Sequence, residues 1–299
     1  MEEKTLAMGW MPDLPDYRDF HYGSDTKIAS PNNHQDDRSV ADLLKTLEAG
    51  EKDKTRNTAL RDFFPPVENQ GRIGSCTANA GVGLVEYYEN RAFGNFTDAS
   101  RLFLYKVTRN LMGASGDTGA PIRTTMKAMR LFGIPPEQYW AYDTDQFDVE
   151  PSAFCSAYGQ NFQAIKYYRL DPLGTSRQEL LERVKQFIDK NFPSMFGFTV
   201  YNSIRAARGS GEIPFPHQNE NVTGGHAVIA VGYDDEKEIQ NPRPGSKKTV
   251  GAVQIRNSWG TGWGDEGYGW LPYEYILQGM AIDWWSLIKN EWVDSGQFS

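Results

Sequence analysis

The chain has 299 residues, of which 39% are hydrophobic and 23% are charged, a mixture typical of a globular protein with one large domain or two small lobes. Its formal net charge is −8 and it has no block of basic residues, which argues against a nucleic-acid partner because phosphate binding needs a basic surface. The longest apolar runs are about five residues, against the roughly 20 that a membrane-spanning helix needs, so no membrane partner is predicted.

Residues 1–58 contain too few apolar side chains for a core of their own. They begin with an acidic, proline-containing stretch that lacks the basic start and the apolar run of a signal peptide. We interpret this segment as an N-terminal extension or a pro-segment, with one short helix expected over residues 40–47. The segment could pack on the rest of the protein in two ways, across a cleft as an inhibitor or on a β lobe as a permanent arm. In either case its candidate anchors are Trp10, Met11, Leu14, Tyr17 and Phe20.

Residues 59–299 have the texture of a folded domain, with predicted helices before predicted strands. Apolar residues at positions i, i+3, i+4 and i+7 favour a helix over residues 77–91. Further helices are expected at 101–109, 121–131 and 176–191, and strands at 196–201, 226–233, 250–256 and 267–271. The polar segment 234–248 is interpreted as an extended hairpin tip. This order predicts an α+β fold of two segregated lobes, a helical lobe at about residues 68–160 and a β lobe at about 161–299.

The chain contains two cysteines, Cys76 and Cys155, which are too few for a disulfide-stapled secreted scaffold. Free thiols in a reducing compartment are the simpler interpretation, and they predict a cytoplasmic protein. The alternative stays open that a leader peptide was removed from the chain, in which case the compartment is unknown. Neither a Cys-x-x-Cys pair nor a His-Glu-x-x-His motif is present, so no metal and no cofactor are predicted. Cys155 is interpreted as an inert, partly buried thiol.

Cys76 follows a glycine-containing stretch and stands at the start of the helix predicted over residues 77–91. The free N–H groups and partial positive charge of a helix N-terminus favour a thiolate, which is the nucleophilic form of the side chain. The same N–H groups stabilise an oxyanion on an attacked carbonyl, and Gln70 can bring a second donor to that point. Cys76 is therefore the candidate nucleophile and Gln70 the candidate oxyanion donor.

His226 opens a continuous apolar run that predicts a strand buried on both faces, and the glycines before it leave room beside its ring. Asn257 follows a strand of alternating polar and apolar residues, and by this alternation its side chain points inward. There its amide can accept the imidazole N–H of His226 and fix the tautomer. Trp259, two residues further on, would shield that hydrogen bond from water. The predicted triad is therefore Cys76, His226 and Asn257.

Three motifs in this order resemble those of the papain-like (C1 family) cysteine peptidases: Gln-x5-Cys opening a helix, Gly-His-Ala-Val before a strand, and Asn-Ser-Trp-Gly-x-Gly-Trp-Gly-x-x-Gly-Tyr from Asn257 to Tyr268. The resemblance covers about residues 60–275. It implies a helical left lobe, an antiparallel β right lobe and an active-site cleft between them. It also implies endopeptidase hydrolysis of polypeptide substrates through a thioester acyl-enzyme, with Gln70 and the Cys76 backbone as the oxyanion hole.

The chain departs from the family pattern at several positions. Ile73 replaces a cysteine that is usually paired in a disulfide, and Thr77 stands where an aromatic residue usually follows the nucleophile. The pro-segment helix signature of the plant and animal enzymes is not recognisable in residues 1–58. The pattern is closer to bacterial or archaeal members, which often carry divergent N-terminal extensions, and residues 1–58 are a candidate inhibitor of their own cleft.

The resemblance further implies a main specificity pocket that is apolar and has room for a bulky side chain. Gly119 would offer backbone hydrogen bonds to an extended substrate, and the residues after it would line the pocket opposite a wall of small residues. The predicted substrate-binding residues are Gly119, Ala120, Pro121, Gly197, Gly225, Ala227 and Trp259.

Two other functions stay open at the level of sequence. An amine can capture the same thioester, which would make the protein an acyl transferase or transpeptidase. The fold can also serve as a non-catalytic binding module, but the complete set of Cys76, His226, Asn257 and Gln70 argues against that alternative.

Overall fold

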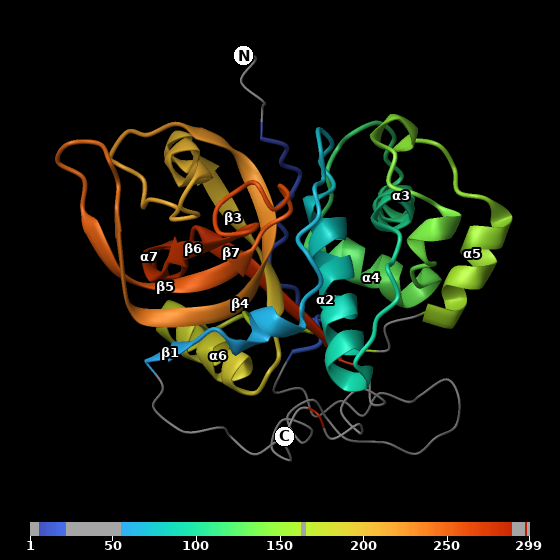
Figure 1. Ribbon diagram of the computed structural model, residues 1–299, viewed down its shortest axis with the longest axis horizontal. Helices are drawn as coiled ribbons and strands as arrows, with labels where there is room; N and C mark the ends of the chain where they lie inside the picture. Colours follow the sequence, from blue (N-terminus) through green and yellow to red (C-terminus); the bar gives the residue numbers. More distant parts are fainter. Residues whose placement is uncertain (1–5, 22–54, 163–165, 289–296, 298–299) are drawn as a thin grey trace.

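The structure is a computed structural model that describes residues 6–21, 55–162, 166–288 and 297. A helical lobe and a β lobe lie side by side, drawn in cyan to green and in yellow to red (Figure 1). The helices are α2 (Cys76–Phe93), α3 (Arg101–Met112), α4 (Ile122–Phe132), α5 (Ala153–Gly159), α6 (Arg177–Asp189) and α7 (Tyr273–Leu277). The strands are β1 (Arg56–Asn57), β2 (Lys166–Arg169), β3 (Ser194–Tyr201), β4 (Val222–Gln240), β5 (Lys248–Arg256), β6 (Tyr268–Pro272) and β7 (Ala281–Ile288). The predicted α+β class is confirmed.

The helix α2 runs through the middle of the molecule, between the rest of the helical lobe and the sheet (Figure 1). Its small residues allow this close packing: a Cβ atom on Gly83 would lie 3.0 Å from Cδ1 of Ile229 on β4, and one on Gly81 would lie 3.0 Å from Sδ of Met129 on α4. The start of α2 is therefore buried at the junction of the two lobes.

The sheet of the β lobe is antiparallel and has the strand order β2-β7-β3-β4-β5-β6, with β1 paired to β4. Ile229 on β4 pairs with Arg256, the last residue of β5. In an antiparallel pair the residues before one partner lie beside those after the other. The register therefore brings His226 next to the segment that begins at Asn257.

Most predicted helices and strands are found where the sequence placed them, with ends that differ by a few residues. The hairpin of segment 234–248 is largely strand, because β4 continues to Gln240 and β5 begins at Lys248. The strands β1, β2 and β7 and the helices α5 and α7 were not predicted, and β1 takes residues 56 and 57 of the N-terminal segment into the sheet. The helix expected at 40–47 lies outside the described residues. In the described part of the chain, no helix combines the length and the apolar character needed to cross a membrane.

Residues 6–21, which we name the arm, descend between the two lobes in dark blue (Figure 1). The arm hydrogen-bonds to the helical lobe through Met11 N and Ala120 O (3.1 Å) and to β4 through Gly9 N and Gly225 O (3.2 Å). Its far end is tied to β2, since the amide of Arg169 donates to the carbonyl of Phe20 (2.7 Å). The arm thus contacts both lobes, and not the β lobe alone.

One aromatic side chain anchors the arm. Trp10 is 5% exposed, whereas Met11, Leu14 and Tyr17 are 40%, 76% and 86% exposed. The prediction that Leu14 and Tyr17 are anchors is therefore wrong, because most of their surface faces water, and Met11 is only partly covered.

Candidate active site

The thiol of Cys76 lies at the first residue of α2 and is fully buried. Burial raises its pKa to about 12, while backbone N–H groups of Ala227, Thr77 and Gly9 act in the opposite direction. These amides come from β4, from α2 and from the arm. The thiol therefore sits where the two lobes and the arm meet, and the residue after His226 contacts it.

One oxygen atom of Asn257 fixes the orientation of His226. Oδ1 of Asn257 accepts the backbone N–H of Ser258 (2.8 Å), which establishes that this atom is the amide oxygen. The same oxygen lies 2.7 Å from Nε2 of His226, so Nε2 carries the ring proton. Nδ1 has no hydrogen-bond partner among the described residues and is left as the proton acceptor.

The imidazole of His226 is enclosed by aromatic rings. Trp259 stacks on it, with centroids 4.5 Å apart and an interplanar angle of 18°, and Phe198 meets it edge-on at 5.9 Å. Burial lowers the pKa of His226 to about 4, against a smaller opposing effect of the Asn257 hydrogen bond. Trp259 thus covers one face of the His226 ring, and its shielding of the His226–Asn257 hydrogen bond stays a prediction.

Gln70 is fully buried and points its amide toward the arm. Its Nε2 donates to Ile73 O (3.0 Å) and to Ala7 O in the arm (3.3 Å), and the latter carbonyl also accepts the indole N–H of Trp259 (3.0 Å). A carbonyl from the arm therefore accepts a hydrogen bond from the predicted oxyanion donor.

Ser258 is a site residue that sequence reasoning missed. Its hydroxyl donates to Oε1 of Gln70 (2.6 Å), which turns Nε2 of that side chain outward, and its backbone N–H bonds to Asn257. Its carbonyl accepts the backbone N–H of Gln70 (2.8 Å). Ser258 thus ties Gln70 to Asn257, and its place directly after Asn257 was the available signal.

Two of the predicted pocket residues, Gly197 and Gly225, lie against the side chain of Trp10. A Cβ atom on Gly197 would lie 1.8 Å from the indole ring and one on Gly225 would lie 2.8 Å from it, so both positions admit the ring only as glycine. Ala120 is fully buried and forms a parallel bridge with Trp10, and Pro121 is the N-cap of α4. Ala227 is 1% exposed and lies on β4 beyond Gly225.

Two features of this pocket differ from the sequence-based picture. On the helical-lobe side, the backbone hydrogen bonds to the arm come from Ala120, while the N–H of Gly119 donates to the hydroxyl of Tyr105 (3.0 Å). The pocket is also not apolar throughout, because the carboxylate of Asp283 lies at its base and accepts the indole N–H of Trp10 (3.1 Å). Asp283 belongs to β7, a strand whose pairing the sequence did not reveal.

Three carboxylates have the spacing of cation ligands: ligand atoms of Glu68, Asp98 and Glu137 lie within 4.8 Å of one another. The guanidinium of Arg101 already pairs with Glu68 (2.8 Å) and Glu137 (3.0 Å). A protein cation therefore already pairs with two of these three carboxylates, and nothing else among the described residues points to a metal there.

The sequence model described as papain family cysteine protease matches residues 53–282, well over half of the chain. The chain belongs to the papain family of cysteine proteases. Together with its relatives, this membership establishes a papain-like fold and a cysteine-type peptidase that hydrolyses peptide bonds with a thiol. The resemblance inferred from the three motifs is confirmed, and polypeptides are the substrate class.

Several papain-family relatives cover this chain to different extents. Xylellain, a cysteine protease from Xylella fastidiosa, is 30% identical in its crystal structure, with a TM-score of 0.69 and coverage of 96% of this chain and 97% of xylellain. An uncharacterized peptidase C1-like protein of Acanthamoeba polyphaga mimivirus is 29% identical over 293 residues, 95% of this chain and 88% of the viral protein. Cathepsin K of Gallus gallus is 29% identical over 217 residues, 70% of this chain but 55% of cathepsin K, so the chain spans about half of that relative.

Proposed function

We propose that Cys76, His226, Asn257 and Gln70 carry out the hydrolysis and that the arm holds this peptidase inactive. In the first step, Nδ1 of His226 takes the proton of the Cys76 thiol and the thiolate sulfur attacks the substrate carbonyl carbon. The carbonyl oxygen becomes an oxyanion that accepts hydrogen bonds from the Cys76 backbone N–H and from Nε2 of Gln70.

The tetrahedral intermediate then collapses. The carbon–nitrogen bond breaks, the imidazolium of His226 gives its proton to the leaving amine, and a thioester remains on Cys76. Water attacks the thioester with His226 again as the base, which releases the carboxylic acid and restores the thiol. Throughout this cycle Asn257 holds the ring so that Nδ1 faces the sulfur.

Inhibition by the arm is supported by its contacts, because the arm occupies the hydrogen-bonding groups and the pocket that a substrate needs. Gly9 N and Trp10 N both donate to Gly225 O (3.2 and 3.1 Å), Ala7 O accepts from Gln70, and the Trp10 side chain fills the pocket. Peptide substrates must displace these contacts before their carbonyl reaches Cys76. We therefore assign the inhibitory role to residues 6–21 of the N-terminal segment.

A substitution at the anchor tests this proposal. In the full-length protein, Trp10→Ala removes a buried indole, which costs about 3–5 kcal/mol at comparable sites, so we expect at least a tenfold rise in kcat/KM for unstructured peptides. The matched variant Trp10→Phe keeps an aromatic ring in the pocket and should give a smaller rise. Equal turnover in all three proteins would contradict inhibition by the arm.

The assignment of the nucleophile is checked in the same background. Adding Cys76→Ala to Trp10→Ala should abolish turnover, because no other described thiol lies at this site. Circular dichroism serves as the folding control, and retained hydrolysis in a folded double variant would remove Cys76 from the mechanism.

A further inference from the structure

The pocket that Trp10 fills has the shape of an indole. Its walls at Gly197 and Gly225 lack side chains where the ring lies against them, and the ring is almost completely enclosed. A flat, wide side chain fits such a gap, whereas a branched aliphatic side chain leaves part of it empty. Shape alone therefore favours an aromatic residue at this position.

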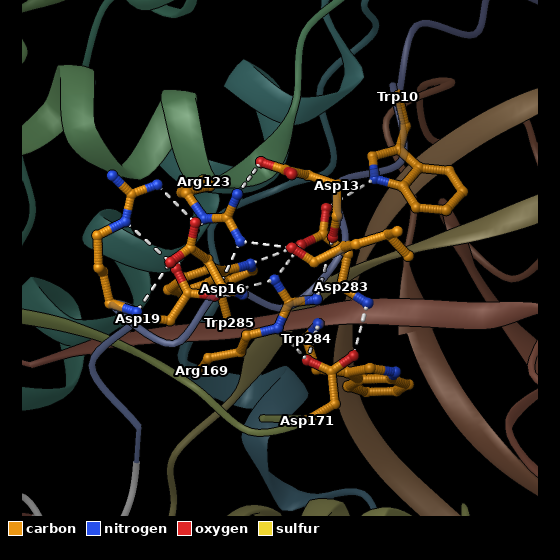
Figure 2. Close-up of polar contacts among 12 residues, drawn as sticks. Trp10, Asp13, Asp16, Asp19, Arg123, Arg169, Asp171, Asp283, Trp284 and Trp285 are labelled. Carbon is orange, nitrogen blue, oxygen red and sulfur yellow. Dashed lines mark hydrogen bonds and ion pairs between the residues drawn. The ribbon is translucent and has the colours of Figure 1, made fainter. Parts of the chain in front are cut away.

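The base of the pocket presents one acceptor atom to the occupant. Figure 2 shows the indole N–H of Trp10 directed at Asp283, whose Oδ2 accepts it at 3.1 Å. The other oxygen, Oδ1, is occupied by the indole N–H of Trp285 (2.7 Å) and lies 3.3 Å from Nη1 of Arg169. Among the described residues, Trp10 is the one hydrogen-bond partner of Oδ2.

The folded body holds Asp283 in place without help from the arm. Its backbone N–H donates to Oδ2 of Asp171 (2.9 Å), and Oδ1 of Asp171 accepts the backbone N–H of Trp284 (3.0 Å) and Nε of Arg169 (2.8 Å). The carboxylate is fully buried. When the arm leaves, Oδ2 therefore stays at the base of the pocket and lacks a donor.

The charges around Asp283 decide which donor fits. Asp13 and Asp19 belong to the arm and leave with it, so Arg123 loses its acidic partners, while Arg169 stays paired with Asp171 and Asp283 (Figure 2). Two cations then balance two carboxylates, and the guanidinium of Arg169 lies beside the acceptor. An arginine or lysine side chain would bring a third cation against Arg169, whereas a neutral N–H donor meets no such repulsion.

We infer that Asp283 makes this peptidase selective for tryptophan at the substrate position that enters the pocket of Trp10. The inference rests on the proposed function, because the pocket is open to substrate only when the arm leaves. Phenylalanine fills the gap but leaves Oδ2 buried without a donor, and sites built around such a hydrogen bond reject analogues that lack it.

The sharpest test compares tryptophan with 3-benzothienylalanine, an isostere in which sulfur replaces the indole N–H. Two peptide substrates that differ only by this exchange are hydrolysed by the full-length Trp10→Ala protein. A hydrogen bond to a charged group predicts a kcat/KM about 10- to 100-fold higher for tryptophan. A ratio near 1, or a higher kcat/KM for the matching arginine peptide, overturns the inference.

Asp283→Asn provides a second, independent variant. The indole N–H of Trp285 donates to Oδ1 and the guanidinium of Arg169 lies 3.3 Å from it, so the amide oxygen takes that side and the NH2 group faces the pocket. A donor then meets the indole N–H, and the ratio should fall to about 1. An unchanged preference for tryptophan in the folded variant would overturn the role of Asp283.

A binding measurement separates this inference from the proposed function. Synthetic peptides of residues 6–21, with tryptophan or the isostere at position 10, are titrated into the Trp10→Ala protein by calorimetry. At least tenfold weaker binding of the isostere supports the inference even if no peptide is hydrolysed. The absence of hydrolysis would contradict the proposed function but not the inference. Equal affinities overturn the inference even if hydrolysis is fast.

Discussion

At Cys76 and His226, burial works against the charged form of the pair. Burial raises the pKa of the thiol to about 12 and lowers the pKa of the imidazole to about 4. Between these values the thiol keeps its proton and the ring stays neutral, so the covered site holds little thiolate at pH 7. If the arm inhibits as we propose, its removal would admit water and weaken both effects, so that access to the cleft and activation of the nucleophile would be linked.

A second buried titratable group, Glu86 in α2, affects stability and not chemistry. Its pKa is raised to about 8 by burial and by the charge of Glu68, and its Oε1 accepts the N–H of Ala99 (3.2 Å). The folded protein therefore binds this proton more tightly than the unfolded chain does. The free energy of unfolding should fall as the pH rises from about 4.5 to about 8, the interval between the unfolded and folded pKa values.

The variant Glu86→Gln should remove this dependence, because the amide keeps an acceptor oxygen but carries no charge. We expect it to unfold at nearly the same urea concentration as the parent at pH 5 and to be more stable by about 3 kcal/mol at pH 8. Glu182→Gln, at an exposed position of α6, is the matched control and should leave the pH profile unchanged. Parallel profiles for all three proteins would contradict the assignment.

At the scale of elements, two arginines of the folded body hold the acidic part of the arm. Arg123 donates to both carboxylate oxygens of Asp19 (2.8 Å each), pairs with Asp13 and donates to Leu14 O (2.7 Å). Arg169 lies 3.5 Å from Asp19 (Figure 2). The arm is thus fixed at two points, by an aromatic anchor in the pocket and by ion pairs beside it.

The variant Asp19→Asn should weaken the second point. Loss of charged hydrogen bonds worth about 1.5–3 kcal/mol predicts a roughly tenfold or greater rise in the peptidase activity of the full-length protein. Salt should raise the parent's activity in the same direction and the variant's activity less. The control is Asp16→Asn, because Asp16 pairs with Arg18 within the arm. Equal effects of the two substitutions would argue against a specific ion-pair contact.

At the scale of the whole molecule, the sequence predicted what local pattern and spacing determine. The motifs predict Gln70, Cys76, His226 and Asn257 as the catalytic residues. The structure brings His226 and Asn257 together, because the antiparallel pairing of β4 with β5 places the start of one apolar run beside the end of the other strand. Apolar periodicity likewise located α2 and most strands.

The base of the pocket and the course of the arm were not predictable in this way. Asp283 reaches the pocket because β7 pairs with β3, although the paired residues are more than 80 positions apart in the sequence. The strand β7 shows no clear alternation of polar and apolar residues, because its side chains are buried on both faces. The arm has no periodicity, and its anchor is a single tryptophan whose partners lie on both lobes. Such contacts depend on the assembled tertiary structure.

The most direct test of the whole account is the rate at which Cys76 is labelled by an epoxysuccinyl thiol probe, followed by mass mapping, in the full-length protein and in Trp10→Ala. The buried Cys155 provides an internal reference. We predict slow labelling of Cys76 in the full-length protein, at least tenfold faster labelling in the variant, and no change at Cys155. Equally fast labelling of Cys76 in both proteins would contradict the claim that the arm covers an otherwise active site.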